Sequence, residues 1–349
     1  MTAELLKQVR ALAPWHMNIV LTPDLRTVDG NSDSVSGADH SIPLTNPAEL
    51  QPLLERLYPK GLSGKRFLDC ACIAGGYSLL ASDLGAYSFG FDVRDHWIQQ
   101  ARFLKRHFAK SDDQVRFEVC DLLDADEHLA DERFDICLFK GIFYHLPDPI
   151  AGLKIVADRT DEVLILDTAS TSGNDDGFLK LYREGVENPM SGVHSLAWLP
   201  TGPVVLCQIL EWLGFDNTCI VYWREHPPSN PTPGRIRIVG ARNTSLLAGL
   251  ATPPTTSIVD PRGSDALSGT CALSAVCQGI IQVTKVEFHL TGPDTDHTVI
   301  GVAVRTWNGW IYSWDTTSVR NGTYILNSVA FDVATNTGRS EGVTITVQN

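Results

Sequence analysis

The segment from Arg66 to Asp92 constrains the fold of this chain more than any other stretch. It contains an apolar run up to Ala71, a turn of small residues around Gly75, a helical pattern, and a second apolar run that ends at Asp92. A strand, a tight turn, a helix and a strand that ends in an acid form a nucleotide-binding βαβ unit. Asp92 follows Asp69 by 23 residues, where a carboxylate can bind both ribose hydroxyls. Because the pattern G-x-G-x-x-G is absent, a dinucleotide is not favoured.

Length and charge narrow the classes of protein that fit. A chain of 349 residues predicts two domains, and 43% apolar residues support globular cores. The net charge of -13 argues against a nucleic-acid groove or an anionic membrane as the main partner, although a local basic patch is compatible with it. The N-terminus lacks the apolar core of a signal peptide, and no apolar run is long enough to span a bilayer. We therefore expect a cytoplasmic protein.

The eight cysteines do not predict a disulfide framework. Six lie inside apolar runs, where buried free thiols are expected. Cys271 and Cys277 stand apart near the C-terminus, and the sequence leaves open whether they pair. Cys70 and Cys72 lack the spacing of a zinc site, so no metal is expected there. The six cysteines in apolar runs are Cys70, Cys72, Cys120, Cys137, Cys207 and Cys219.

Residues 1–64 have the pattern of an N-terminal extension or cap. Leu5, Val9 and Leu12 are spaced for one face of a short helix. The Gly-, Ser- and Asp-rich stretch Asp29–Asp39 predicts a loop, and Pro47–Leu57 predicts an amphipathic helix. Such an extension could cover the mouth of the ligand site or serve as a packing arm, and both interpretations fit the pattern.

Residues 65–242 alternate regularly between strands and helices, so we expect an α/β fold. The pattern predicts a Rossmann-like, doubly wound sheet of seven strands that is mostly parallel, with an antiparallel hairpin at one edge. Ala169–Pro200 is expected to be mostly irregular. After Asp92 the expected strands are Val115–Val119, Phe134–Phe139, Glu162–Thr168, Asn217–Trp223 and Arg235–Ala241, and the expected helices are His96–Lys110, Pro149–Ala157 and Val204–Leu213.

The composition changes after residue 242. Residues 243–258, rich in Thr, Ala and Pro, are expected to be a linker. Residues 259–349 contain short strands of alternating polarity separated by Asn-Gly turns, which predicts an all-β, immunoglobulin-like sandwich. We expect no chemistry in this module, and an oligomer contact or glycan binding is its proposed role. The expected strands are Thr284–Leu290, Thr298–Arg305, Trp310–Asp315, Thr323–Asp332 and Gly342–Val347, and its aromatic set is Trp307, Trp310, Tyr312 and Trp314.

Several motifs in residues 60–242 together resemble the class I S-adenosylmethionine (SAM) methyltransferases. They are D-x-x-C-x-x-G from Asp69, G-x-D ending at Asp92, C-D-L at residues 120–122, and FDICLFKGIFYHLPDP from Phe134. Within that superfamily, Phe139–Pro149 and LPTGPVVLCQILEWLGF most resemble the tRNA wobble-uridine (cmo5U-type) methyltransferases, which use a carboxylated SAM. One departure is Ala71, which replaces the first glycine of the usual motif. The run NGTYILNSVAFDVATNTGRS is similar to bacterial Ig-like modules, with Tyr324 as the corner tyrosine.

The resemblance implies SAM as cofactor and a set of cofactor-binding residues. Asp92 would bind the ribose, Asp121 the adenine amino group, and Leu122 the adenine ring. Gly75 and its turn would face the methionine portion, whereas Ala71 permits close approach less freely. Lys140 would lie on the sulfonium side, where it suits an extra carboxylate on the cofactor, or it would point to substrate or solvent. The full expected set is Asp69, Ala71, Gly75, Asp92, Val93, Asp121, Leu122 and Lys140.

Methyl transfer to oxygen or nitrogen needs a base for the acceptor proton. His145 follows the fourth strand, where open α/β sheets bind ligands, although it could simply cap or pack. His194 and Glu184 are alternatives. Asp167 ends the fifth strand and could hold a base or a metal, but no second carboxylate accompanies it.

Three hypotheses for function follow. The first is a SAM-dependent methyltransferase that acts on a small molecule or a sugar. The second is a tRNA wobble-uridine modifying enzyme, against which the acidic charge and the appended sandwich argue. The third is a non-catalytic SAM-fold binding or scaffold protein.

Overall fold

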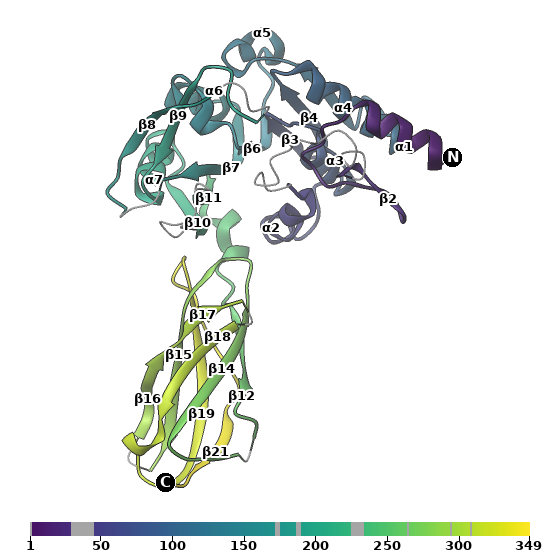
Figure 1. Cartoon of the computed structure of the whole chain (residues 1–349). Helices are drawn as coiled ribbons and strands as arrows, with labels where there is room; N and C mark the ends of the chain where they lie inside the picture. Colours follow the sequence, from purple (N-terminus) through teal and green to yellow (C-terminus); the bar gives the residue numbers. More distant parts are fainter. Residues whose placement is uncertain are drawn as a thin grey trace. The chain divides into compact units, whose positions relative to one another are not determined.

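The computed structural model describes residues 2–28, 45–171, 175–185, 190–224, 234–263, 265–293, 295–307 and 309–349 (Figure 1). The described chain divides into two compact units. The first consists of Met1–Cys219 and Trp223–Gly249, and the second of Leu250–Asn349 together with Ile220–Tyr222. The expected loop Asp29–Asp39 lies outside the described residues.

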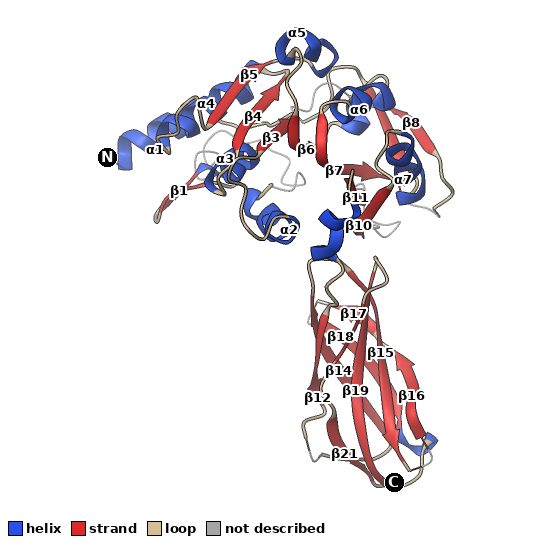
Figure 2. Ribbon diagram, turned by 180° about the vertical axis from the view of Figure 1, so that it is seen from behind, coloured by secondary structure: helices blue, strands red, loops and turns tan. Residues whose placement is uncertain are grey.

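The first unit is built on a seven-stranded sheet in the order β10-β11-β7-β6-β3-β4-β5 (Figure 2). The strand pairs among β5, β4, β3, β6 and β7 are parallel, and β11 runs antiparallel to β7. The expected Rossmann-like sheet is therefore confirmed, with β10 at its edge. The strands are β3 (Arg66–Cys70), β4 (Tyr87–Asp92), β5 (Val115–Val119), β6 (Phe134–Lys140), β7 (Thr160–Ser170), β10 (Asn217–Arg224) and β11 (Gly234–Ala241).

Helices pack against this sheet through their apolar faces: α3 contacts β3, β4 and β5, α4 contacts β4 and β5, α6 contacts β6 and β7, and α7 contacts β11. Asp148 begins α6 by accepting a hydrogen bond from the Ala151 N–H at 3.0 Å, with Pro149 in the first turn. No helix in the described ranges has the length and apolarity needed to cross a bilayer. The helices are α3 (Gly76–Asp83), α4 (Asp95–His107), α5 (Ala125–Leu129), α6 (Pro149–Ala157) and α7 (Pro203–Trp212), with 3₁₀ turns η3 (Leu122–Asp124), η4 (Phe143–His145) and η5 (Thr244–Leu250).

The strand order reverses between β3 and β6, which makes this point the topological switch of the sheet. The chain turns away from the sheet after Cys70 on β3 and after Lys140 on β6. Ligands of open α/β sheets bind at the carboxyl ends of the strands on either side of such a point. The fold therefore places the turn after Cys70 beside Lys140, in the region expected to bind a cofactor.

The N-terminal segment contains the expected helices: α1 (Thr2–Ala11), then η2 (Pro47–Leu50) continuing into α2 (Gln51–Leu57). Between them, β1 (Val20–Thr22) and β2 (Leu25–Arg26) form a small antiparallel pair. Trp15 is buried and its indole N–H donates to the Val9 carbonyl at 2.8 Å. Asn46 caps η2 by accepting from the Ala48 N–H.

The stretch Ala169–Pro200 is more regular than its sequence predicts. The strand β7 continues to Ser170 because its pairing with β11 extends to Gly234. Within the stretch, β8 (Leu179–Arg183) and β9 (Leu196–Pro200) form a separate antiparallel hairpin. The side chains of β8 are nearly all exposed, so the sequence lacks the alternation that signals a half-buried strand.

The second unit is a β-sandwich of two main sheets, in the orders β12-β14-β18-β17 and β13-β21-β19-β15-β16, with β20 paired to β19. Four of its strands, β15, β18, β19 and β21, lie at the expected positions. The expected strand Thr298–Arg305 is instead divided between β16 and β17, which belong to different sheets, and β12, β13, β14 and β20 were not predicted. The expected linker 243–258 is wrong at both ends, because η5 occupies Thr244–Leu250 and β12 begins at Thr255. The strands are β12 (Thr255–Asp260), β13 (Ala266–Leu267), β14 (Thr270–Gln278), β15 (Val283–Gly292), β16 (Thr295–Val302), β17 (Val304–Thr306), β18 (Gly309–Asp315), β19 (Gly322–Asp332), β20 (Thr337–Arg339) and β21 (Val343–Val347), with a 3₁₀ turn η6 (Thr316–Ser318).

Aromatic residues build the core of this sandwich. Trp310, Trp314 and Tyr324 are buried in it, and the Tyr324 hydroxyl donates to the Arg320 carbonyl at 2.8 Å. This bond to backbone four residues upstream is the expected tyrosine corner. Of the four aromatic residues singled out in the sequence, Trp307 is the one at the surface, with 93% of its area exposed. All eight cysteines, Cys271 and Cys277 included, are free thiols.

Candidate functional site

A cavity opens at the carboxyl ends of β3, β4 and β6 in the first unit. It holds about 1050 Å³ of empty space, counting the part that is open to solvent. A cavity with a few convergent polar groups at the carboxyl ends of parallel strands is the usual form of a ligand site in an α/β fold. The residues of the expected site that line it are Asp69, Ala71, Asp92, Val93, Asp121, Leu122, Lys140, His145 and His194.

The turn between β3 and α3 brings backbone to the cavity wall. Ala71 and Ile73 line the cavity and have positive φ angles of 54° and 49°, which few non-glycine residues adopt. Gly75 also has a positive φ, of 73°, but it is not among the residues that line the cavity. A Cβ atom at Gly75 would lie 2.4 Å from the ring of Phe117. The geometry therefore gives Gly75 a packing role and places Ala71 at the cavity. The sequence had predicted the opposite, with Gly75 closer to the cofactor than Ala71.

Asp92 lies at the end of β4 with its carboxylate fixed by backbone. One oxygen accepts from the Ile73 N–H at 3.1 Å and the other from the Arg94 N–H at 3.0 Å. The Val93 N–H also interacts with this carboxylate. Two carboxylate oxygens can together accept about four hydrogen bonds, so Asp92 can still accept from a ligand. Burial raises the pKa of Asp92 to about 6, although the N–H groups of Arg94 and Ile73 act in the opposite direction. The carboxylate is thus mostly ionised at pH 7.

Asp69 lies deeper in the fold. Its carboxylate accepts from the Ser78 N–H at 3.1 Å and from the Ser78 hydroxyl at 2.8 Å, which ties β3 to α3. Burial raises the pKa of Asp69 to about 7, with a smaller contribution from nearby Asp92. Asp69 therefore fixes the turn between β3 and α3, and it also lines the cavity.

The end of β5 supplies the residues expected to bind the adenine. Asp121 caps the turn η3 by accepting from the Leu123 N–H at 3.0 Å, and Leu122 is buried against the cavity. Val93, directly after β4, is partly exposed at the cavity wall. An acceptor oxygen beside an apolar wall suits a planar base with an amino group.

His145 is held by a carboxylate. Its Nδ1 lies 2.7 Å from an oxygen of Glu184, and the same oxygen accepts from the Gly192 N–H at 2.9 Å. The pairing fixes the ring and assigns the proton of the neutral imidazole to Nδ1, which leaves Nε2 as the basic nitrogen. His194 lines the same cavity, so the structure brings both histidines and Glu184 to one region.

Residues 190–194 form part of the cavity wall. The Arg94 guanidinium donates to the Ser191 carbonyl, and Glu184 accepts from the Gly192 N–H. A side chain at Gly192 would lie 2.7 Å from the Cβ of His145. The absence of a side chain at Gly192 therefore lets this segment approach His145 closely.

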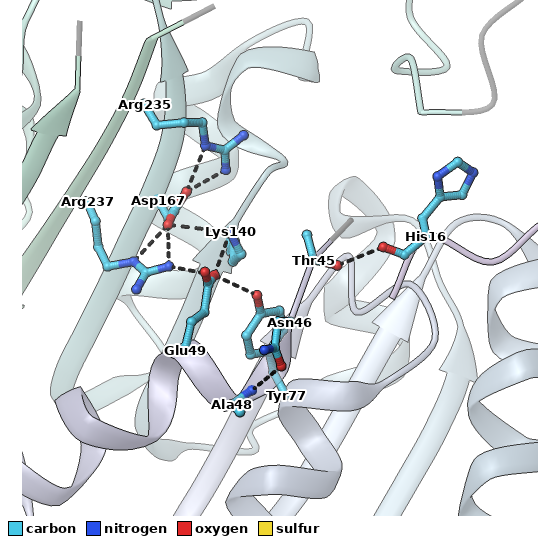
Figure 3. Close-up of polar contacts among 10 residues, drawn as sticks. All are labelled: His16, Thr45, Asn46, Ala48, Glu49, Tyr77, Lys140, Asp167, Arg235 and Arg237. Carbon is cyan, nitrogen blue, oxygen red and sulfur yellow. Dashed lines mark hydrogen bonds and ion pairs between the residues drawn. The ribbon is translucent and has the colours of Figure 1, made fainter. Parts of the chain in front are cut away.

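A buried group of charges, here called the basic cluster, lies at the ends of β6, β7 and β11: Lys140, Arg235 and Arg237 surround Asp167 (Figure 3). Arg235 Nε donates to Asp167 at 3.1 Å, and Arg237 Nε donates at 2.7 Å. The Asp167 side chain has no exposed area. A buried carboxylate needs such partners, so Asp167 orients the two arginines.

The N-terminal segment reaches the same cluster through Glu49. Its carboxylate lies 3.2 Å from Arg237 and 3.6 Å from Lys140, and it accepts from the Tyr77 hydroxyl at 3.0 Å (Figure 3). Burial acts to raise the pKa of Glu49, but Lys140, Arg237 and the Tyr77 bond outweigh it and hold the pKa below its usual value. Met17 and Thr45 of this segment line the cavity. The segment thus contributes to the site and does not act as a packing arm alone.

Several residues of the site were not predicted. Arg235 and Arg237 lie two positions apart on β11, an otherwise apolar strand, and this pattern of two charges on one face is a signal that could have found them. Tyr144 lines the cavity and is hydrogen-bonded to Arg235. Glu49 carries no local signal, since only the fold brings it to β11. Among the described ranges, no group of three His, Cys, Asp or Glu residues is placed to hold a metal ion.

Comparisons with known proteins agree with this geometry. Residues 62–177 match the family model described as a methyltransferase domain, and residues 254–327 match the model described as a bacterial Ig domain. The tRNA U34 carboxymethyltransferase of Campylobacter hominis is 35% identical over 120 residues, which are 33% of this chain and 40% of that protein. The corresponding protein of Aliarcobacter butzleri is 30% identical over 162 residues, which are 45% of this chain and 49% of that protein. The chain thus spans less than half the length of these relatives.

Solved structures show a similar fold. The N-terminal domain of EvdMO1, solved in the presence of S-adenosylhomocysteine (SAH) and D-fucose, has 23% sequence identity and a TM-score of 0.54, over 69% of this chain and 97% of that one. The same domain with SAH bound gives 22% identity and a TM-score of 0.53, over 70% and 98%. The match of residues 62–177 to a methyltransferase domain and of residues 254–327 to a bacterial Ig domain confirms the two resemblances drawn from the sequence at the level of these domain models.

Proposed function

We propose that this chain is a SAM-dependent methyltransferase that acts on a small-molecule or sugar acceptor. The observation that carries the proposal is Asp92, whose carboxylate lies at the cavity wall at the end of β4 and is held there by the backbone N–H groups of Ile73 and Arg94. Such a group is suited to a ribose diol. The turn Ala71–Ile73 and the pair Asp121 and Leu122 line the same cavity. Together with Asp92 they would form a site for a whole nucleoside.

The chain's residues fit the other parts of SAM. Asp121 would accept from the adenine amino group and Leu122 would pack on the ring. The backbone at Ala71 and Ile73 would lie against the amino-acid portion. When bound, SAM supplies a methyl group already activated on a sulfonium, so the protein's main task is to align the acceptor.

His145 is our candidate for the base that takes the acceptor proton. Glu184 holds the Nδ1 side of the ring, and the ring lines the cavity. The carboxylate would stabilise the imidazolium that forms when Nε2 accepts a proton. His194, on the same wall, is the alternative.

The charge distribution favours a small acceptor. Two of the three cations of the basic cluster are largely buried, since Lys140 and Arg237 have only 11% and 5% of their side-chain area exposed, whereas Arg235 has 30% exposed. A nucleic-acid site needs basic side chains at the surface. The EvdMO1 domain solved with SAH and D-fucose, whose fold is similar, supports a sugar as one class of acceptor.

A tRNA wobble-uridine modifying activity is the second candidate, because the curated relatives are tRNA U34 carboxymethyltransferases. Their matches cover only 40% and 49% of those proteins. The net charge of -13 also argues against a tRNA substrate.

Isothermal titration of the full chain with SAM and with SAH tests the proposal. We expect micromolar affinity for both, and transfer of labelled methyl from SAM to an acceptor in a panel of sugars and small molecules. Binding without transfer to any acceptor, unmodified tRNA included, would favour the scaffold hypothesis. Absence of SAM and SAH binding would refute the proposed cofactor.

A further inference from the structure

The peptide group between Ser191 and Gly192 is held from two sides. Its carbonyl accepts a hydrogen bond from the Arg94 guanidinium, and its N–H donates to the Glu184 carboxylate at 2.9 Å. The peptide is trans, so its C=O and N–H lie in one plane and point in opposite directions. Arg94 and Glu184 therefore contact opposite edges of one rigid unit.

The two groups that hold this peptide carry opposite charges. Hydrogen bonds to a guanidinium or a carboxylate are stronger than those between neutral groups. A cation at the carbonyl and an anion at the N–H also polarise the peptide in the same sense, so the two bonds strengthen each other. Ser191 is buried, with 6% of its area exposed, which limits competition from water. The peptide thus links Arg94 firmly to Glu184.

The two ends of this link belong to different parts of the site. Arg94 lies just after β4, and its backbone N–H donates to Asp92 at 3.0 Å. Glu184 lies 2.7 Å from Nδ1 of His145, through the same oxygen that accepts from Gly192. Arg94, Asp92 and His145 all line the cavity. The contacts therefore connect the carboxylate proposed for the ribose with the histidine proposed as the base.

Packing joins the same peptide to His145 directly. A Cβ atom at Gly192 would lie 2.7 Å from the Cβ of His145, so the backbone of Gly192 lies against that residue. A movement of the peptide would reach the histidine through this contact as well as through Glu184.

We propose that Arg94 is a positioning residue for the base. By holding the Ser191 carbonyl it orients Glu184 on the other side of the peptide. Glu184 in turn fixes the ring of His145 and keeps the proton of the neutral imidazole on Nδ1. The base is thereby tied to the end of β4, and a base held in one orientation is the more effective one. This inference rests on the proposed methyltransferase function, in which His145 takes the acceptor proton.

The experiment reads the tautomer of His145, without cofactor or acceptor. The full chain is labelled with ¹⁵N-histidine, and long-range ¹H–¹⁵N correlation spectra at pH 9, where imidazoles are ordinarily neutral, show which ring nitrogen carries the proton. His145→Gln assigns the signal. We expect the proton on Nδ1 in the wild type. Arg94→Met should shift the ring toward the Nε2–H form, which free histidine prefers in water. Arg94→Lys can still donate to the Ser191 carbonyl and should restore most of the wild-type signal.

Two further variants show whether the effect is specific. Arg102→Met is the matched control, because Arg102 is exposed on α4 and also donates to a backbone carbonyl, that of Phe117, at 3.2 Å. It should leave the His145 signal unchanged. In a chain that already carries Glu184→Gln, Arg94→Met should add little further shift, since Arg94 acts through Glu184.

The spectra can overturn the proposal in several ways. A wild-type ring with its proton on Nε2, an Arg94→Met spectrum like that of the wild type, or equal shifts in Arg94→Met and Arg102→Met would each do so. An Arg94→Met shift that is just as large in the Glu184→Gln chain would do so as well.

Calorimetry with SAH at pH 8 separates positioning from cofactor binding. We expect Arg94→Met to bind SAH within about 3-fold of the wild type, because Asp92 keeps its carboxylate and its backbone hydrogen bonds. A fall of 10-fold or more would make Arg94 a cofactor-binding residue and overturn the positioning role. A wild-type chain that binds no SAH would refute the proposed function, whereas the histidine signals, read without cofactor, test the link from Arg94 to His145 by themselves.

Discussion

Asp92 accepts a hydrogen bond from Ile73 in the turn after β3 and lines the cavity. Removing its charge therefore tests the proposed cofactor site directly. We expect Asp92→Asn to weaken SAH binding roughly 10- to 150-fold, because a hydrogen bond to a charged group contributes about 1.5–3 kcal/mol. Since the pKa of Asp92 is about 6, wild-type affinity should also fall as the pH drops below 6. Titration calorimetry at pH 5.5 and 7.5 measures both effects. Asp95→Asn, on the exposed start of α4, is the control, and unchanged affinity in Asp92→Asn would remove the ribose assignment.

Asp69 gives a prediction for stability. Its folded pKa of about 7 lies above the ordinary value of 3.8, so the folded chain binds the proton more tightly than the unfolded chain. The stability gained from protonated Asp69 is therefore complete near pH 4 and is lost as the pH rises to 7. Asp69→Asn stays neutral and should gain on the order of 1–3 kcal/mol relative to wild type between pH 5 and pH 8. Urea unfolding followed by circular dichroism at 222 nm checks this, with exposed Asp113→Asn as control; parallel pH curves for Asp69→Asn and wild type would contradict it.

The sequence predicted some site residues better than others, for a physical reason. Asp92 and Asp121 follow parallel strands, whose carboxyl ends meet at one edge of a sheet, so the pattern predicted that they lie together. Glu49 and Glu184 come from segments joined to the site only by tertiary contacts, and Glu184 was named only as one alternative. Gly75 was predicted to contact the ligand because glycine permits close approach. In the structure, the space that a Gly75 side chain would need is occupied by the ring of Phe117.

At the level of elements, strands with a strong apolar pattern were predicted and exposed ones were not. All strands of the central sheet were recognised. The strands β3, β6 and β7 give the strongest signal, because they are buried along nearly their whole length. The β8–β9 hairpin was missed, since β8 is exposed and its pairing depends on β9 alone. Burial against a core creates the sequence pattern, so a hairpin that lies on the surface leaves little trace.

The next prediction concerns Glu184, which directly follows β8 of that hairpin and is paired with His145. Glu184→Gln keeps an acceptor for the ring and for the Gly192 N–H but removes the charge that would stabilise an imidazolium. We expect kcat to fall about 10-fold, with SAH affinity and the KM for SAM within 2-fold. His145→Ala should lose roughly 10²–10⁴-fold in kcat.

The double variant separates positioning from general damage to the fold. If Glu184 acts through His145, adding Glu184→Gln to His145→Ala should cause little further loss of kcat. Additive losses, or a parallel fall in SAH affinity, would contradict the positioning role of Glu184.

At the level of the whole molecule, composition changes and turn signals predicted two domains joined by a linker at residues 243–258, and the chain divides between Gly249 and Leu250. The strand β12 was taken for linker because Thr255–Asp260 is largely polar and half-exposed. The role of the second unit stays a proposal. With Trp310 and Trp314 in its core, a glycan or oligomer contact through its aromatic residues rests on the exposed Trp307.

The last prediction is that the chain ending at Gly249 folds and binds SAH within 2-fold of the full chain. All seven strands of the central sheet end by Ala241, and the residues that line the cavity lie between Met17 and Arg235. No described residue after Gly249 lines that cavity, so removal of residues 250–349 should leave cofactor affinity unchanged. Titration calorimetry compares the two chains, and the fragment 250–349 serves as a control that should bind no SAH. A folded Met1–Gly249 chain with at least 10-fold weaker binding, or an insoluble one, would show that the methyltransferase unit depends on the sandwich.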